Sequence, residues 1–170
     1  EKYPDGIVDL SVGTPVDEAP EVAREALSAA SDAHGYPTVA GTSELREAIA
    51  EFCRAHRGAP SAFDVSGVLP TIGSKELVAH LPFQLGLGTG DAVAFPHIAY
   101  PTYDLGARLA GATPVPIDVS ALARAGEGTL NSDACLANVR LLWLNTPSNP
   151  TGAVLSIEEM RSLVAWARER

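Results

Sequence analysis

Apolar and polar positions follow two periods along this chain, one helical and one extended. Some segments of about a dozen residues carry apolar side chains every three or four positions, as on one face of an amphipathic helix. Between them stand short apolar runs that are nearly unbroken, which is typical of strands buried on both faces. The pattern predicts helices over residues 21–30, 43–57, 74–85 and 100–109 and from Ser156 onward, and strands over residues 65–69, 91–95, 113–117 and 140–144.

Local signals mark where these helices begin and end. Thr42 or Ser43 can cap the second helix, and Gly58 can end it. The run Ser156-Ile-Glu-Glu159 has the spacing of a capping box and predicts the start of the last helix. Residues 120–138 are polar and rich in glycine and alanine, and they predict a loop with at most one short helix.

Strands that alternate with helices of this length indicate βαβ crossovers. The expected fold class is therefore α/β, with three αβα layers around a mainly parallel sheet. Residues 1–19 are expected to form an extended arm, and residues 20–170 to form the domain that contains the sheet.

Composition narrows the class of protein. The 170 residues carry a formal net charge of −9, which argues against a nucleic-acid or anionic membrane surface as partner. No apolar run approaches the roughly 20 residues of a membrane span, and the first residues lack the apolar core of a signal peptide. Cys53 and Cys135 are isolated, which predicts reduced thiols in a cytoplasmic protein. The four histidines lack the close pairing of a zinc site, so no metal is expected.

Three segments could carry chemistry, and each follows a predicted strand. Gly73-Ser74-Lys75 forms a strand-to-helix turn whose free N–H groups suit a phosphate, although a plain serine cap is the commoner reason for such a turn taken alone. Tyr100 could stack on a flat ligand, or it could be an ordinary core tyrosine. The loop of residues 145–152 presents Asn149, which could donate to a phenolic oxygen or could simply form a turn.

The order of these segments is more informative than any one of them. All three fall at the carboxyl ends of strands in one predicted sheet, where open α/β folds bind ligands. A phosphate turn, a stacking aromatic ring and an amide together describe a pocket for a planar ring that bears a phosphate and an ionisable oxygen. Pyridoxal phosphate fits that description.

At these residues the sequence resembles the class I/II aminotransferases, pyridoxal-phosphate enzymes of fold type I. The run Asn145-Thr-Pro-Ser-Asn-Pro-Thr-Gly152 is similar to the family's Asn-x-Pro-x-Asn-Pro-x-Gly signature. The run from Tyr36 to Arg46 is similar to its Tyr-x-x-x-x-Gly-x-x-x-Leu-Arg segment, and Ser11–Pro15 to its Gly-x-Pro turn. Within the family, residues 72–77 and 99–111 look most like actinobacterial N-succinyldiaminopimelate aminotransferases.

The resemblance implies roles for individual residues. Backbone groups of Gly73, Ser74 and Lys75, with the Ser74 hydroxyl, would bind the cofactor phosphate, and Tyr100 would stack on the ring. Asn149 would donate to the ring oxygen, and its peptide bond to Pro150 would be cis. Two further residues, both in the first 40 positions of the chain, also receive roles from the resemblance. Tyr36 would reach the phosphate of the partner subunit in a homodimer, and Gly13 would lie near the substrate carboxylate.

The resemblance also implies which residues this chain lacks. The family's Schiff-base lysine and its carboxylate-binding arginine are expected beyond Arg170, so the chain should be the N-terminal portion of an aminotransferase, with an incomplete large domain and no catalytic residue of its own. Residues 1–19 would then belong with the small domain. The expected reaction transfers an amino group from glutamate to N-succinyl-2-amino-6-ketopimelate, in lysine and diaminopimelate synthesis. Open alternatives are another amino-acid aminotransferase, a C–S lyase of the same fold, and a non-catalytic regulator that binds pyridoxal phosphate.

Overall fold

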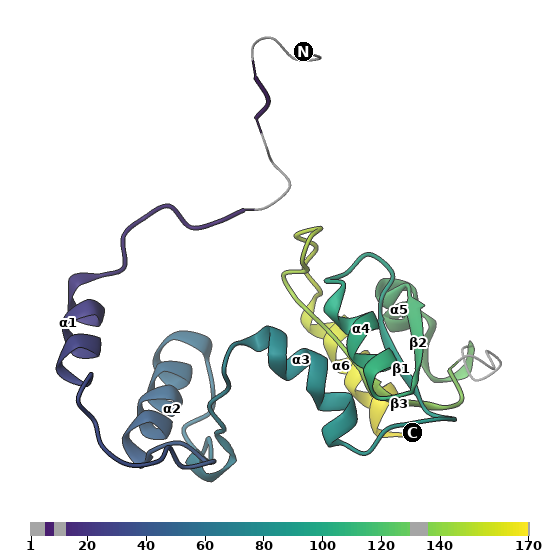
Figure 1. Cartoon of the computed structure of the whole chain (residues 1–170). Coiled ribbons are helices and arrows are strands. Elements are labelled where there is room, and N and C mark those ends of the chain that lie inside the picture. The colour runs from purple at the N-terminus through teal and green to yellow at the C-terminus, as the bar shows by residue number, and fades with distance from the viewer. Residues whose placement is uncertain (1–5, 9–12, 130–135, 170) are drawn as a thin grey trace. The chain divides into compact units, whose positions relative to one another are not determined.

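A computed structural model describes residues 6–8, 13–129 and 136–169 of the chain. Its internal contacts separate two units, Glu1–Val65 and Ser66–Arg170 (Figure 1). The extended arm expected over residues 1–19 lies partly outside the described residues, and its residues 6–8 and 13–16 have no regular structure. The division predicted at residues 19 and 20 stays a prediction.

The first unit contains two helices that the sequence predicted. Helix α1 spans Glu21–Ala29, and α2 spans Ser43–Arg57. Thr42 caps α2, because its hydroxyl oxygen accepts the Leu45 N–H at 3.2 Å, and Gly58 ends the helix at a φ of 69°. Both terminal signals in the sequence are thereby confirmed.

Two arginines of α2 bind the segment that follows the helix. Arg46 donates to the Val65 carbonyl at 2.7 Å, and Arg54 donates to the Phe63 carbonyl at 3.1 Å. The strand predicted over residues 65–69 is wrong, because Val65–Gly67 forms a single 3₁₀ turn, η1. A strand must pair with a neighbour, and none of the strands in the described residues pairs with this segment.

The second unit alternates helices with parallel strands. The sheet has the order β2-β1-β3 and both of its pairings are parallel, as predicted. In chain order the elements are α3 (Ser74–Gln84), β1 (Ala92–Pro96), α4 (Thr102–Leu109), β2 (Thr113–Ile117), α5 (Val119–Thr129), β3 (Val139–Leu142) and α6 (Ile157–Arg168).

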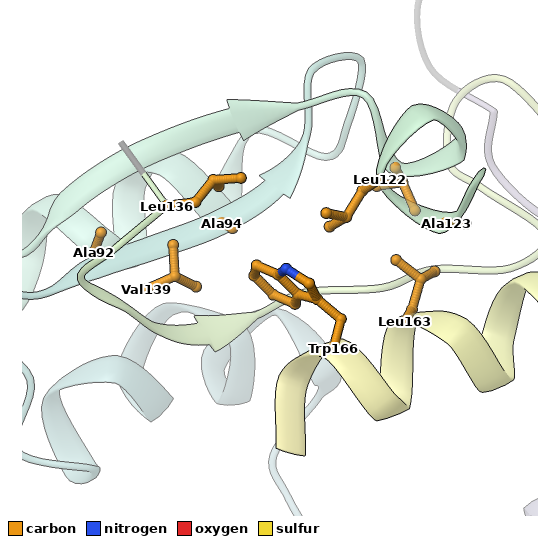
Figure 2. Close-up of a cluster of buried hydrophobic side chains, with 9 residues drawn as sticks. Ala92, Ala94, Leu122, Ala123, Leu136, Val139, Leu163 and Trp166 are labelled. Atoms are coloured by element: carbon orange, nitrogen blue, oxygen red, sulfur yellow. The ribbon is translucent and has the colours of Figure 1, made fainter. Parts of the chain in front are cut away.

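The central strand β1 is covered on both faces. Val93 packs with Ala107 of α4 and with Ala112 on one face of the sheet. Ala92 and Ala94 point to the other face and join a larger cluster with side chains of α5 and α6. Figure 2 shows Leu163 and Trp166 of α6 pointing into this cluster. The three-layer αβα architecture is therefore confirmed.

Helix α5 is longer than the sequence predicted. Residues 120–138 were expected to form a loop with at most one short helix, yet α5 occupies 11 residues from Val119 to Thr129. Asp118 caps it, since its carboxylate accepts the Ala121 N–H at 2.9 Å. Val119, Leu122 and Ala123 are buried on one face of α5, so burial against the sheet outweighs the low helical propensity of its glycines.

Two prolines close the outer edge of β2. The Thr113 N–H donates to Asp91 and the Ile117 carbonyl accepts from His97, both at 2.9 Å, so the odd-numbered residues of β2 face β1. Pro114 and Pro116 therefore face away from β1, where their missing N–H groups leave no donor for another strand. This edge is protected against further pairing.

Gly106 sets the approach of α4 to α3. A Cβ atom at Gly106 would lie 2.8 Å from the Val78 carbonyl oxygen and 3.0 Å from that of Ala79. Both distances are below ordinary van der Waals contact, and the opposing atoms belong to the backbone. No side chain can move to make room, so only glycine permits this helix spacing.

We predict that Gly106→Ala destabilises the protein, although alanine is normally the better helix residue. The propensity gain is about 1 kcal/mol, whereas forced overpacking costs about 1–3 kcal/mol. Urea unfolding should show a net loss of about 1 kcal/mol. Gly88→Ala is the control, because its Cβ would meet only the Ala110 carbonyl oxygen at 3.8 Å. Equal stability of the two variants would contradict the spacing role.

A pH-dependent cap begins α6. The Glu159 carboxylate accepts the Ser156 N–H at 2.8 Å, and the Ser156 hydroxyl accepts the Glu159 N–H at 3.2 Å. These bonds hold the pKa of Glu159 below its ordinary value of 4.5. Folding favours the charged form, so this stabilisation is full above that value and is lost as the pH falls through the lowered pKa.

Glu159→Gln should therefore reduce stability at neutral pH and become harmless in acid. Thermal melts of both proteins across this pH range measure the difference. A gap in melting temperature that stays constant down to the most acidic pH would show that the carboxylate charge has no part in the cap.

Candidate functional site

The loops that follow β1 and β3 lie at one edge of the sheet, the edge formed by the carboxyl ends of its strands. The two strands are parallel neighbours, so the segments after their carboxyl ends emerge side by side. The chain leaves β1 toward β2 on one side, whereas β3 lies on the other side. This reversal is a topological switch point, the position where open α/β sheets bind ligands.

Helix α3 begins at the same edge. It ends at Gln84, and residues 85–91 then lead directly into β1 at the opposite edge. Eleven helical residues span roughly 16 Å, and five strand residues span about the same length. Val78 and Ala79 of α3 lie beside Gly106 in the middle of α4, and Gly88, after α3, lies near Ala110 at the end of α4. The two helices therefore run in the same direction, and α3, like α4, begins toward the carboxyl end of β1.

The phosphate turn, residues 73–75, is an open helix N-terminus. Gly73 is the N-cap, with a φ of 79° and a ψ of 145°, and no side chain caps the helix. Ser74 and Lys75 are exposed in the first turn. The N–H groups of a helical first turn have no intrahelical acceptor, so this end can bind an anion.

The amide loop, residues 145–152, holds its shape through its own polar groups. The Asn145 side-chain oxygen accepts the Asn149 N–H at 2.8 Å, and the Ser148 carbonyl accepts the Gly152 N–H at 2.7 Å. The Asn149–Pro150 peptide bond is cis, as expected. The Thr146–Pro147 bond, for which we made no prediction from the sequence, is also cis. Asn149 is exposed on this loop.

Tyr100 belongs to a group of four aromatic rings, which we call the ring cluster: Phe95, Tyr100, Tyr103 and Trp143. The Tyr103 ring stacks on Trp143 at 5.4 Å between centroids and meets Tyr100 edge-on at 6.3 Å. It also lies 6.3 Å from Phe95. Burial, together with the neighbouring Tyr100, raises the pKa of Tyr103, so its hydroxyl stays neutral.

A cavity of about 250 Å³ opens at the same edge of the sheet. It extends the cluster of α5 and α6, because Val119, Leu144 and Leu155 belong to both. Of the amide loop it includes Asn145, Ser148 and Thr151, but neither Asn149 nor Tyr100 lines it. The ring cluster lies toward the opposite face, where Trp143 packs against Val93 and Ala107.

Five of the predicted site residues belong to the second unit. The segments carrying Gly73, Ser74, Lys75, Tyr100 and Asn149 share one edge of the second unit. Tyr36 and Gly13 belong to the first unit, where the Tyr36 side chain is fully exposed at 101%. A Cβ atom added at Gly13 would meet no heavy atom within 4 Å.

Sequence reasoning did not identify Tyr103, Trp143 or the cavity residue His97. The spacing of Tyr103, three positions after Tyr100 at a predicted helix start, was the available signal for the first of them. In the part of the chain that the structure describes, no three histidine, cysteine or acidic side chains are grouped as metal ligands would be. Among the same residues, no helix combines the length and apolar character needed to cross a membrane.

Comparison with known proteins supplies the family. Residues 5–170 match the family of class I and II aminotransferases. The chain is 51% identical to the 4-dedimethylamino-4-oxo-anhydrotetracycline transaminase OxyQ of Streptomyces rimosus, over 99% of this chain and 43% of that protein. It is 35% identical to the LL-diaminopimelate aminotransferase of Aquifex aeolicus, over 96% of this chain and 43% of that protein.

A solved structure agrees with these relatives. The N-succinyldiaminopimelate aminotransferase of Mycobacterium tuberculosis superposes with a TM-score of 0.73 at 30% identity, over 93% of this chain and 42% of that one. The chain thus spans about two-fifths of the length of these three proteins. An αβα frame with a phosphate turn and an amide loop at its switch point agrees with these matches, and the chain belongs to the class I and II aminotransferases, a family that depends on pyridoxal phosphate.

Proposed function

We propose that the protein containing this chain is an aminotransferase, and that this segment binds the phosphate and ring of its cofactor. The observation that carries the proposal is the convergence of the phosphate turn, Tyr100 and the amide loop at one switch point. The cofactor, when bound, supplies an electron sink that lets an amino group leave one carbon and join another.

The phosphate turn fits a dianionic group. The N–H groups from Gly73 to Lys75 are first-turn donors, and the helix dipole places partial positive charge beside them. The Ser74 hydroxyl adds a further donor. Gly73 has open space around its Cβ position, so a phosphate can approach the backbone closely.

Tyr100 and Asn149 complete the binding surface. The Tyr100 ring would cover one face of the cofactor's ring and exclude water from it. Asn149 would donate its side-chain amide to the ring oxygen and stabilise the ionised form of that oxygen. The backbone N–H of Asn149 is already bonded to the Asn145 side chain, so cofactor binding should cost this residue little further conformational entropy.

Tyr36 and Gly13 have roles that depend on parts outside the second unit. We propose that Tyr36 donates to the cofactor phosphate of a second copy, so the protein acts as a homodimer in the cytoplasm. The full exposure of its side chain is consistent with such a contact. Gly13 would lie beside the substrate carboxylate, where a missing side chain leaves room.

For the substrates, we propose glutamate as amino donor and N-succinyl-2-amino-6-ketopimelate as acceptor, in diaminopimelate synthesis. Support comes from the similarity to the N-succinyldiaminopimelate aminotransferase structure. The second candidate uses the diaminopimelate skeleton without the succinyl group, which the similarity to LL-diaminopimelate aminotransferase favours.

The complete protein, supplied with pyridoxal phosphate, should transfer the amino group of glutamate to the succinylated keto acid. The measurement is the specificity constant for this acceptor and for the unsuccinylated skeleton, by 2-oxoglutarate release. A higher value for the second acceptor would establish the second candidate. Release of pyruvate from S-substituted cysteine would instead indicate a C–S lyase, and bound cofactor without any turnover would indicate a regulator.

Replacing Gly73 should weaken cofactor binding more than replacing Lys75. A non-glycine residue at the φ and ψ of Gly73 costs about 1–3 kcal/mol. The free Gly73→Ala variant should relax this turn, and binding must then restore the strained conformation, so the Kd for pyridoxal phosphate should rise roughly tenfold. Lys75 contributes only its backbone N–H in this proposal, so Lys75→Ala should change the Kd by less than about threefold. Absorbance titration of the complete protein measures both. A larger loss in Lys75→Ala would show that its ammonium group binds the cofactor.

A further inference from the structure

The four rings of the ring cluster are not equivalent, because Tyr103 is the only one in contact with the other three. Its centroid lies 5.4 Å from that of Trp143 and 6.3 Å from those of both Phe95 and Tyr100. Tyr103 and Phe95 are buried, at 7% and 8% exposure. Trp143 is half-buried and follows β3, and Phe95 lies in β1. Tyr103 therefore links the carboxyl ends of both strands that form the switch point.

Tyr103 itself is held firmly. It is the second residue of α4, and its N–H donates to the Tyr100 carbonyl at 3.1 Å. The neighbouring Thr102 is also buried, and Gly106, one turn further along, holds α4 against the backbone of α3. A ring fixed on a packed helix in this way has little freedom to change rotamer.

Tyr100 is less enclosed than Tyr103. It is half-buried in the connection between β1 and α4, outside both elements. Its ring meets that of Tyr103 at an interplanar angle of 86°, an edge-to-face arrangement that aromatic pairs prefer. The ring of Tyr103 thereby restricts the orientation of the half-buried Tyr100 ring.

We propose that Tyr103 is a positioning residue, whose ring, stacked on Trp143 and held by α4, sets the angle at which Tyr100 covers the cofactor's ring. The inference rests on the proposed function, in which Tyr100 stacks on pyridoxal phosphate. Tyr103 need not touch the cofactor. It acts by preparing the stacking surface before binding, so that less freedom is lost when the cofactor binds.

The test compares Tyr103→Leu with Tyr103→Phe in the complete protein. Leucine removes the ring contacts, so the Kd for pyridoxal phosphate should rise about three- to tenfold, the value of an edge-to-face pair. Phenylalanine keeps the ring and should stay within about twofold. The visible circular dichroism of the bound cofactor reports its orientation and should change in Tyr103→Leu only.

Leu163→Ala separates positioning from general destabilisation. Leu163 is 1% exposed in the cluster of α5 and α6, on the opposite face of the sheet. This variant should lower the melting temperature while leaving the Kd and the dichroism of the cofactor unchanged. Loss of affinity in Leu163→Ala to the same degree as in Tyr103→Leu would overturn the positioning role.

A double-mutant cycle with Tyr100→Leu shows whether Tyr103 acts through Tyr100. In the Tyr100→Leu background, Tyr103→Leu should have no further effect on the Kd, whereas additive losses would overturn the inference. If Tyr103→Leu fails to fold, Trp143→Leu serves in its place, because it removes the half-buried ring on which Tyr103 stacks. This variant should produce the same change in dichroism at smaller amplitude. An unaltered spectrum there would also overturn the inference.

The two proposals fail in different ways. A parent protein that binds no pyridoxal phosphate would overturn the proposed function, and the positioning role with it. A parent protein that binds the cofactor, alongside a Tyr103→Leu variant with equal affinity and an unaltered spectrum, would overturn the positioning role alone.

Discussion

The burial of β1 on both faces is the constraint on which the second unit depends. Val93 and Ala94 are completely inaccessible to solvent, one facing α4 and the other facing α5 and α6. Because helices cover both of its faces and strands flank both of its sides, a ligand can approach β1 only at its ends. The carboxyl ends of the strands offer free N–H groups and partial positive charge, because the helices that follow or precede parallel strands have their N-termini there.

The site combines two kinds of support. The phosphate turn and Tyr103 stand at the starts of α3 and α4, two helices that pack together through the contact of Gly106 with the backbone of Val78 and Ala79. The amide loop, by contrast, is organised by hydrogen bonds among its own residues, such as that from the Asn149 N–H to Asn145. A binding constellation needs both, because rigid elements set distances whereas loops present side chains in directions that helices and strands cannot.

The named relatives help to separate cofactor binding from substrate choice. A transaminase of a tetracycline precursor is 51% identical to this chain, and an LL-diaminopimelate aminotransferase is 35% identical over nearly the same residues. Proteins whose names give such different substrates therefore share this frame. What they have in common is the need to hold one cofactor, the task that we propose for the phosphate turn, Tyr100 and the amide loop. Function lies in the site, and the fold alone does not select the substrate.

The sequence by itself determined the parallel α/β class and most helix and strand positions, and it led us to propose Gly73, Tyr100 and Asn149 as site residues. These follow from periodicity, caps and turn residues, which act over a few positions of the chain. Only the tertiary structure decided that residues 65–69 form no strand, that α5 is a full helix, and that Tyr103 links Tyr100 to Trp143. Strand pairing, burial of α5 and stacking of rings 40 residues apart all depend on contacts between segments distant in sequence, which local patterns do not encode.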